Sequence, residues 1–236
     1  MPPALQPVPG IHDWPLFISA GLLLNLTPGV DMALVLRCSV GQGFKAGAAA
    51  ALGVGAGCGV HIALSALGLS ALLAGSPLAF GLLRWAGAAY LVWLGWGLMR
   101  PQQDRHPAHP GVALPTSPPR GIQASAPWRR LFAQGFLTNA LNPKVAMFFL
   151  AFVPQFITAD APHKSAAFGL LGAVFVVNAT AVNLALAWAA ATLRQRLGSN
   201  PARQPAMQAI GRWLIRGVGA FFVALGLRLA LGDPLR

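Results

Sequence analysis

The stretch NLTPGVD, residues 25–31, places a proline, a glycine and a carboxylate in the middle of an apolar segment that runs from residue 14 to residue 36. Pro28 lacks a backbone N–H and clashes with the carbonyl of Leu24, so helical hydrogen bonding is interrupted there. In a membrane the freed carbonyls must find partners, so such a break lines a cavity or packs on protein. The Asp31 carboxylate costs about 2.5–3.5 kcal/mol at the centre of a span, which marks it as a candidate functional residue.

A second stretch, LTNALNPK at residues 137–144, repeats the pattern in the other half of the chain. It brings another proline, two asparagines, and Lys144, which is the one lysine within a predicted span. When residues 28–32 are aligned with residues 143–147, the proline, the valine and the methionine coincide. The sequence therefore predicts that each half of the chain has a break in its own first span.

The composition indicates a membrane protein. Of the 236 residues, 56% are hydrophobic and only 9% are charged, whereas about a quarter of the residues of a soluble domain are charged. This excludes a water-soluble enzyme, and it argues against a nucleic-acid-binding protein despite a net charge of +12. We expect an all-α integral membrane protein with six transmembrane helices. The predicted spans cover residues 14–36, 46–73, 78–99, 131–157, 165–193 and 210–231.

The basic residues predict the orientation. Twelve of the 17 lysines and arginines lie in or beside the connections after the first, third and fifth spans. Since cytoplasmic loops are enriched in Lys and Arg, we expect these connections in the cytoplasm and both termini outside it. Residues 1–11 carry no Lys or Arg, so no cleavable targeting segment is expected. The sixth span is the weakest, because it crosses only if Arg216 and Arg228 reach opposite interfaces.

Residues 101–127 form one long connection, in which seven prolines and little apolar periodicity predict a disordered cytoplasmic linker. The linker separates residues 1–100 from residues 128–236, and three spans are expected in each part. The second part then enters the membrane with the opposite orientation. Such inverted repeats are common in alternating-access transporters, whose site lies between the repeats near the midplane. His106 and His109 in the linker lack further metal ligands, so no metal site is expected.

Asp31 and Lys144 leave two interpretations open. In the first, the carboxylate and the ammonium neutralise each other as an ion pair across the midplane. In the second, both are exposed in turn to an aqueous path, where Asp31 exchanges a proton. Lys144 or a helix N-terminus at a proline break would then meet the carboxylate of a substrate.

Several other residues are assigned to packing or to the membrane interface. His61 in the second span could relay protons, but a hydrogen bond to a neighbouring helix is the favoured interpretation. Asn183 in the fifth span is interpreted in the same way. The glycines of residues 46–59 permit close approach of helix backbones, either within the chain or in a dimer. Tyr90 follows Arg84 in the third span and is expected among the interfacial aromatic residues.

Four ordered motifs together resemble the LysE/RhtB family of bacterial amino-acid exporters. They are NLTPGVD at residues 25–31, GQG at 41–43 with AG at 46–47, RWAGAAYLVWLG at 84–95, and NALNPK at 139–144. The resemblance covers nearly the whole chain except the linker and the termini. It implies a six-span inner-membrane protein that moves amino acids such as lysine, threonine, homoserine or leucine outward, driven by the proton gradient.

The resemblance also implies where substrate and proton bind. In the first motif it indicates Asn25, Thr27, Pro28, Gly29 and Asp31. In the last motif it indicates Asn142, Pro143 and Lys144, and we include the neighbouring amide of Asn139. The chain departs from the family at Val30, where a second proline is common, so a milder break is expected.

We therefore expect an exporter of amino acids or close analogues in the bacterial inner membrane, coupled to inward proton flow and without a cofactor or metal. Its partners would be the amino acid, protons and the lipid bilayer, with no nucleic acid, and a homo-oligomer stays open. The absence of a further intramembrane acid favours a neutral amino acid over lysine or arginine.

Two other classes of protein are weighed against the exporter. A membrane enzyme would need converging catalytic groups, but the sequence has no His-x-x-x-His, no Gly-x-Ser-x-Gly and no second carboxylate within a predicted span. A non-transporting membrane subunit does not explain why Asp31 and Lys144 are buried at a cost in free energy.

Overall fold

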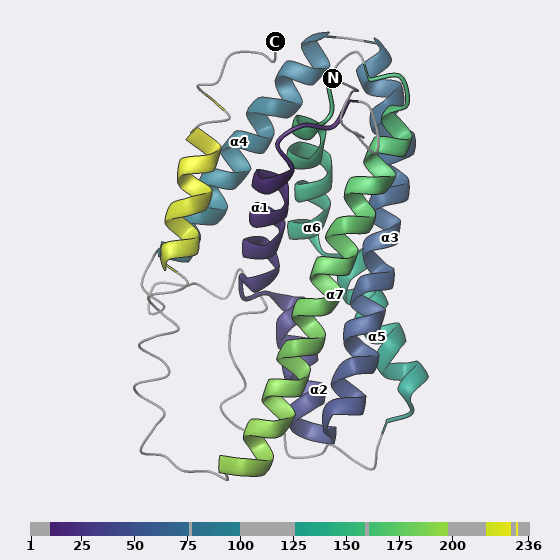
Figure 1. The fold of residues 1–236 in the computed structure, drawn as a ribbon, viewed down its shortest axis with the longest axis vertical. Coiled ribbons are helices and arrows are strands. Elements are labelled where there is room, and N and C mark those ends of the chain that lie inside the picture. Colours follow the sequence, from purple (N-terminus) through teal and green to yellow (C-terminus); the bar gives the residue numbers. More distant parts are fainter. Residues whose placement is uncertain are drawn as a thin grey trace, which may run out of the picture.

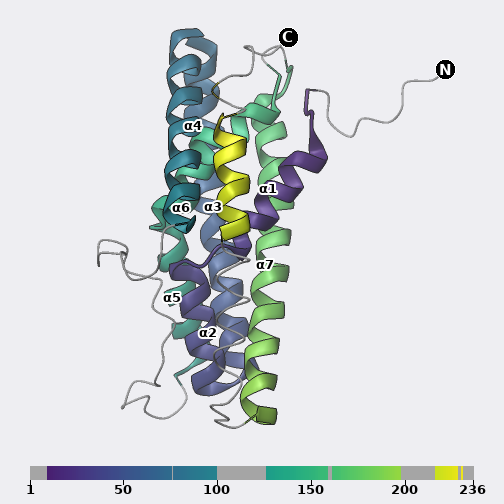
Figure 2. The same ribbon diagram turned by 90° about the vertical axis from the view of Figure 1, so that its left-hand side faces the viewer.

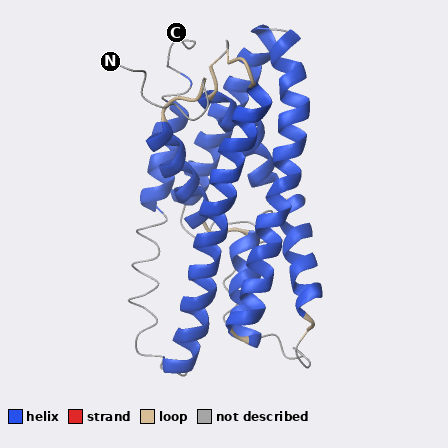
Figure 3. Ribbon diagram, turned by 45° about the vertical axis from the view of Figure 1, so that its right-hand side comes forward, coloured by secondary structure: helices blue, strands red, loops and turns tan. Residues whose placement is uncertain are grey.

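The structure is a computed structural model, and it describes residues 10–75, 77–99, 126–158, 161–197, 216–227 and 230. Within these ranges the chain is helical, and a single isolated β-bridge joins Ile11 to Ile157. Figures 1 and 3 show the helices standing side by side along one axis. They are α1 (Trp14–Leu26), α2 (Val30–Gln42), α3 (Phe44–Gly75), α4 (Pro77–Met99), α5 (Trp128–Ala140), α6 (Pro143–Met147), the π-helical turn η2 (Phe148–Phe152), the 3-10 turn η3 (Val153–Phe156), α7 (Lys164–Leu197) and a C-terminal helix (Arg216–Leu227).

The all-helical prediction is confirmed for these residues. Most of the predicted linker, residues 101–125, lies outside them, as do residues 1–9 and Arg228. The division of the chain into two parts joined by a linker therefore stays a prediction.

Two helices are broken where the sequence predicts it. The axes of α1 and α2 differ by 55° across the break at Pro28, and α5 differs by 47° from the helical segment Pro143–Phe156. Both prolines lie at the joint, where their missing N–H groups end the hydrogen bonding of the preceding helix. Figures 1 and 2 show both joints near the middle height of the bundle, with α1 above α2 and α6 above α5.

Length and apolar composition identify candidate membrane spans. Within α3 and α7, the segments Phe44–Leu67 and Lys164–Arg194 are long and apolar enough to cross a membrane. If each of the two bent helix pairs at the breaks is counted as one span, the described residues contain up to four candidate spans. Helix α4 and the C-terminal helix are outside this set. The arrangement of six spans in two inverted repeats therefore stays a prediction.

The surface carries many large apolar side chains. Leu67 is 77% exposed and Leu141 is 78% exposed, and Trp188, Val177 and Leu64 are also exposed. Soluble monomers rarely expose apolar side chains on this scale, whereas lipid is a suitable solvent for them. The surface therefore agrees with the membrane class that the composition predicts.

Helix α3 packs on α5 and α7. A Cβ atom added to Gly57 would lie 2.6 Å from the carbonyl oxygen of Phe136 and 2.9 Å from the Cβ atom of Asn139, whereas one at Gly59 would meet nothing within 4 Å. Gly53 and Gly135 also face backbone atoms across the α3–α5 interface. The predicted close helix packing is confirmed, and α5 occupies this glycine face within the chain.

A cluster of phenylalanines joins the upper halves of the broken helices to α7. Phe148 of η2 lies with its ring centroid 4.8 Å from that of Phe175 in α7, and Phe17 of α1 lies 5.2 Å from Phe156 of η3. All four side chains are buried. Aromatic contacts of this kind are stabilising beyond the burial of area, so they hold α1 and η2 in place above the two breaks.

Candidate functional site

The two breaks meet through Asp31. This residue lies in the first turn of α2, and its Oδ2 atom accepts hydrogen bonds from Nδ2 of Asn139 at 2.9 Å and from Nδ2 of Asn142 at 2.8 Å. Asn142 is the N-cap of α6, where its Oδ1 atom accepts from the backbone N–H of Lys144 at 3.0 Å. The cap uses the oxygen of the Asn142 amide and turns its nitrogen toward Asp31.

Lys144 makes the opposite connection. Its Nζ atom donates to the carbonyl oxygens of Leu24 and Thr27, each at 3.2 Å, at the C-terminal end of α1. The Leu24 carbonyl loses its i+4 donor at Pro28 and also accepts from the backbone N–H of Thr27 at 3.2 Å. A cation also suits the negative end of a helix dipole, so Lys144 stabilises the first break from the second.

The two charged side chains therefore cross between the breaks. Asp31, at the first break, accepts hydrogen bonds from two asparagine side chains at the second break. Lys144, at the second break, donates hydrogen bonds to two backbone carbonyls at the first break. Among the described residues, no salt bridge within 4.0 Å joins Asp31 to Lys144, so the two side chains do not form a direct ion pair. Each charged side chain instead hydrogen-bonds to neutral amide or carbonyl groups of the other broken helix.

His61 stabilises the second break. Its Nε2 atom lies 2.8 Å from the carbonyl oxygen of Asn139, which loses its i+4 donor at Pro143 and also accepts from the backbone N–H of Asn142 at 2.8 Å. Because a carbonyl only accepts, Nε2 carries the proton and donates. The ring also stacks on Phe149 at a centroid distance of 6.3 Å. The favoured interpretation of His61, a hydrogen bond to a neighbouring helix, is confirmed.

The remaining predicted residues lie at the same two breaks. Thr27 is buried, and its Oγ1 atom donates to the carbonyl of Leu23 at 2.8 Å. A Cβ atom at Gly29 would lie 3.2 Å from Nζ of Lys144, so a glycine leaves room for the ammonium group. Pro28, Pro143 and Asn25 complete the set, and the structure thus brings all nine predicted site residues together.

The breaks enclose a small cavity of about 20 Å³, lined by residues of α1, α2, α3, α5, α6 and α7. This volume holds roughly one water molecule. Three buried polar atoms of lining residues have no hydrogen-bond partner: Oδ1 of Asp31, Oδ1 of Asn139 and Nδ2 of Asn25. Buried polar groups are nearly always paired, so these three atoms are available to hydrogen-bond a water or a ligand group in the cavity.

Sequence reasoning missed some neighbours of the site. Cys58, Phe175 and Asn183 line the cavity, although the sequence assigns Asn183 to contacts between helices. Tyr90 is partly buried and donates to the carbonyl of Lys144 at 3.3 Å, so its expected place among the interfacial aromatic residues is wrong. Asn183 and Asp31 are both polar residues within predicted spans, and that signal could have grouped them.

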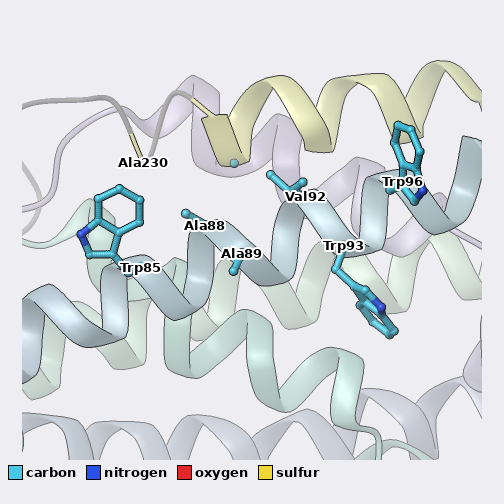
Figure 4. Close-up of a pocket in the computed structure, with 8 residues that line it drawn as sticks. Trp85, Ala88, Ala89, Val92, Trp93, Trp96 and Ala230 are labelled. Carbon is cyan, nitrogen blue, oxygen red and sulfur yellow. The ribbon is translucent and has the colours of Figure 1, made fainter.

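A larger hollow lies elsewhere, between α4 and the C-terminal helix. It measures about 500 Å³ and is lined by alanine, valine, glycine and the tryptophans Trp85, Trp93 and Trp96. Figure 4 shows Trp85 and Trp96 at its two ends and Val92 between them. Among the described residues no charged side chain lines this hollow, and its apolar lining does not suit an ionic metabolite. Among the described residues, no group of three or more His, Cys, Asp or Glu side chains could hold a metal ion.

Comparison with known proteins agrees with this geometry. The family described as LysE type translocator matches residues 22–233. The chain belongs to this family. The family resemblance predicted from the motifs is confirmed, and the protein is a membrane transporter and not an enzyme.

Individual relatives cover nearly the full length. The chain is 32% identical to the homoserine/homoserine lactone efflux protein of Salmonella typhi, over 92% of this chain and 95% of the relative. It is 27% identical to the leucine efflux protein of Salmonella choleraesuis, over 94% and 96%. It is 31% identical to an uncharacterized membrane protein of Pseudomonas aeruginosa, over 95% and 98%. No solved structure matches the chain.

Proposed function

We propose that the protein exports a neutral amino acid or a close analogue across the inner membrane through the cavity between the two breaks, in exchange for protons. One observation carries the proposal: Asp31 and Lys144 reach from each break to the other around a buried cavity. The family and the relatives named for homoserine, homoserine lactone and leucine efflux support the substrate class.

The breaks allow the cavity to open and close. A proline joint has fewer backbone hydrogen bonds than a continuous helix, so a change in the 55° or the 47° bend disturbs little else. The cavity of about 20 Å³ is too small for an amino acid, so this arrangement corresponds to a closed state. Export then requires the two breaks to part on one side and afterwards on the other, as in other transporters built on broken helices.

Asp31 is suited to couple this motion to a proton. As a carboxylate it accepts two charge-assisted hydrogen bonds from Asn139 and Asn142, which join α2 to α5 and α6. Proton binding removes the negative charge and weakens both hydrogen bonds. Protonation of Asp31 would therefore loosen the contact between the two broken helices, and proton release would restore it.

The predicted orientation is part of the proposal. The start of α1 and the end of the C-terminal helix lie at one end of the bundle in Figure 1, opposite the turn at Gly43 between α2 and α3. The latter end also has the start of α5, with Arg129 and Arg130, and the last turns of α7, with Arg194. We propose that this basic end faces the cytoplasm.

Transport by the purified protein in proteoliposomes tests the proposal. Vesicles preloaded with labelled L-homoserine or L-leucine should release it faster after a pH step that drives protons inward. Asp31→Asn should abolish the response to the pH step and retain some exchange between labelled and unlabelled amino acid. The control is Asp13→Asn, because this carboxylate is 57% exposed and lies outside the cavity.

Two results would contradict different parts of the proposal. No amino-acid flux from well-folded protein would exclude the substrate class. Flux that ignores the pH step in the wild type, or an Asp31→Asn variant that remains fully pH-driven, would exclude proton exchange through this carboxylate.

A further inference from the structure

The unpartnered atoms of the cavity are unevenly divided between acceptors and donors. Asn139 donates through Nδ2 to Asp31, and because a carboxylate only accepts, this contact fixes the orientation of the Asn139 amide. Its Oδ1 atom and the Oδ1 atom of Asp31 both remain buried and unpartnered. The hydrogen-bonded pair, whose two residues line the cavity, therefore has two open acceptors, one of them charged.

The missing partner must be a donor. Lys144, the cation of the second break, is held by the carbonyl oxygens of Leu24 and Thr27, and it forms no ion pair with Asp31 within 4.0 Å. A primary ammonium group has three N–H donors and no acceptor, so it carries enough donors for both open oxygens. A group of this size also fits the space near these atoms, which holds about one water molecule.

We propose that the ammonium group of the exported molecule binds Oδ1 of Asp31 and Oδ1 of Asn139, and that a proton and this ammonium occupy the Asp31 carboxylate in turn. This inference rests on the proposed function and specifies its substrate chemistry. The ammonium is the essential recognition element. The carboxylate of an amino acid meets the open donor Nδ2 of Asn25 and is auxiliary.

If the Asp31 carboxylate binds either a proton or the substrate ammonium but never both, which we call exclusive occupancy, substrate export is coupled to proton entry without any further proton-binding residue. A protonated carboxyl group has lost the charge that attracts an ammonium, and an ammonium on the carboxylate blocks the proton. One carboxylate therefore exchanges one proton for one substrate. Whichever occupant is bound also changes the hydrogen bonds that Asp31 accepts from the second broken helix.

Other ionisable groups near Asp31 have to be separated from it in a test. Lys144 of α6 is the nearest positive charge, and α3 contributes His61, which bonds Asn139, and Cys58, which lines the cavity. The lining residues from α1, α5 and α7 are not ionisable. Arg194 of α7 caps the carbonyls at the far end of α2. An Asp31 variant is therefore needed to assign any pH dependence.

The first experiment changes the ligand and leaves the protein intact. The purified protein in detergent is tested for competition with labelled L-homoserine by L-homoserine, L-homoserine lactone and N-acetyl-L-homoserine. A second series tests competition with labelled L-leucine by L-leucine, its methyl ester and N-acetyl-L-leucine. The molecules that keep the ammonium should bind within about tenfold of the parent amino acid, even without a carboxylate. The N-acetyl compounds should bind at least about 100-fold more weakly, because acetylation removes the positive charge that pairs with Asp31 and leaves one N–H donor for two acceptors.

The second experiment counts protons. Binding of the parent amino acid in weakly buffered solution should release up to about one proton per molecule at acidic pH, and the release should disappear in Asp31→Asn but persist in the exposed control Asp13→Asn. N-acetyl compounds that compete as well as their parents would overturn the inference while leaving transport intact. Proton release that persists in Asp31→Asn would overturn exclusive occupancy. If none of the six compounds binds, both the proposed substrate class and this inference are wrong.

Discussion

Replacing Gly57 by alanine tests the interface on which the site depends. Gly57 lies in the middle of α3, one turn before His61 on the same helix face. An added methyl group would lie 2.6 Å from the carbonyl oxygen of Phe136 and 2.9 Å from Cβ of Asn139, both on α5. The first of these neighbours is backbone, so it cannot rotate away, and the two helices must separate.

The size of the separation follows from these distances. Ordinary van der Waals contact begins near 3.4 Å, so α3 and α5 must part by about 0.8 Å. The same movement lengthens the contact between His61 and the Asn139 carbonyl from 2.8 Å to a distance at which it is no longer a hydrogen bond. Overpacking costs about 1–3 kcal/mol, against a gain of about 1 kcal/mol from the higher helix propensity of alanine.

Gly59→Ala is the matched control. A Cβ atom there meets nothing within 4 Å, so the variant receives the propensity gain without the clash. We expect Gly57→Ala to unfold about 3–8 °C below the wild type in detergent and Gly59→Ala to unfold at the wild-type temperature or above. Transport per folded molecule should fall about tenfold in Gly57→Ala and stay within about twofold in Gly59→Ala. A Gly57→Ala variant as stable and active as Gly59→Ala would refute the close α3–α5 contact.

Three further predictions concern charges and orientation. His61→Leu removes one of the hydrogen bonds that the Asn139 carbonyl accepts, at a cost of about 0.5–1.5 kcal/mol, and should lower transport by up to about tenfold. His61→Gln can still donate and should retain most of the transport, so equal losses would contradict the carbonyl contact. Because Asp31 and Lys144 are held by different groups, combining Asp31→Asn with Lys144→Met should not restore the membrane abundance and transport lost in each single variant, and full recovery would indicate an ion pair. A reporter fused after Arg236 should be active only if it is of a kind that functions outside the cytoplasm. A cysteine introduced at residue 110 should not react with membrane-impermeant thiol reagents in intact cells, and labelling of this cysteine would contradict the proposed orientation.

The membrane class and the two breaks could be predicted from sequence because their causes are local. A high apolar content with few charges acts through composition alone, and Pro28 and Pro143 interrupt the helices that contain them whatever surrounds them. Burying Asp31 and Lys144 carries a cost that depends on depth in the membrane, so both residues could be recognised as candidate site residues.

Only the tertiary structure decided which groups these residues bind. Asp31 and Asn139 are 108 positions apart in the chain. They are in contact because glycines at the α3–α5 interface let α5 pack closely on α3, which places the break after α5 beside the break after α1. The same packing sets His61 on the carbonyl freed by Pro143 and turns Tyr90 inward to Lys144. Residue types specify which polar groups need partners, but the partner of each is chosen by the distance between helices, which no local pattern contains.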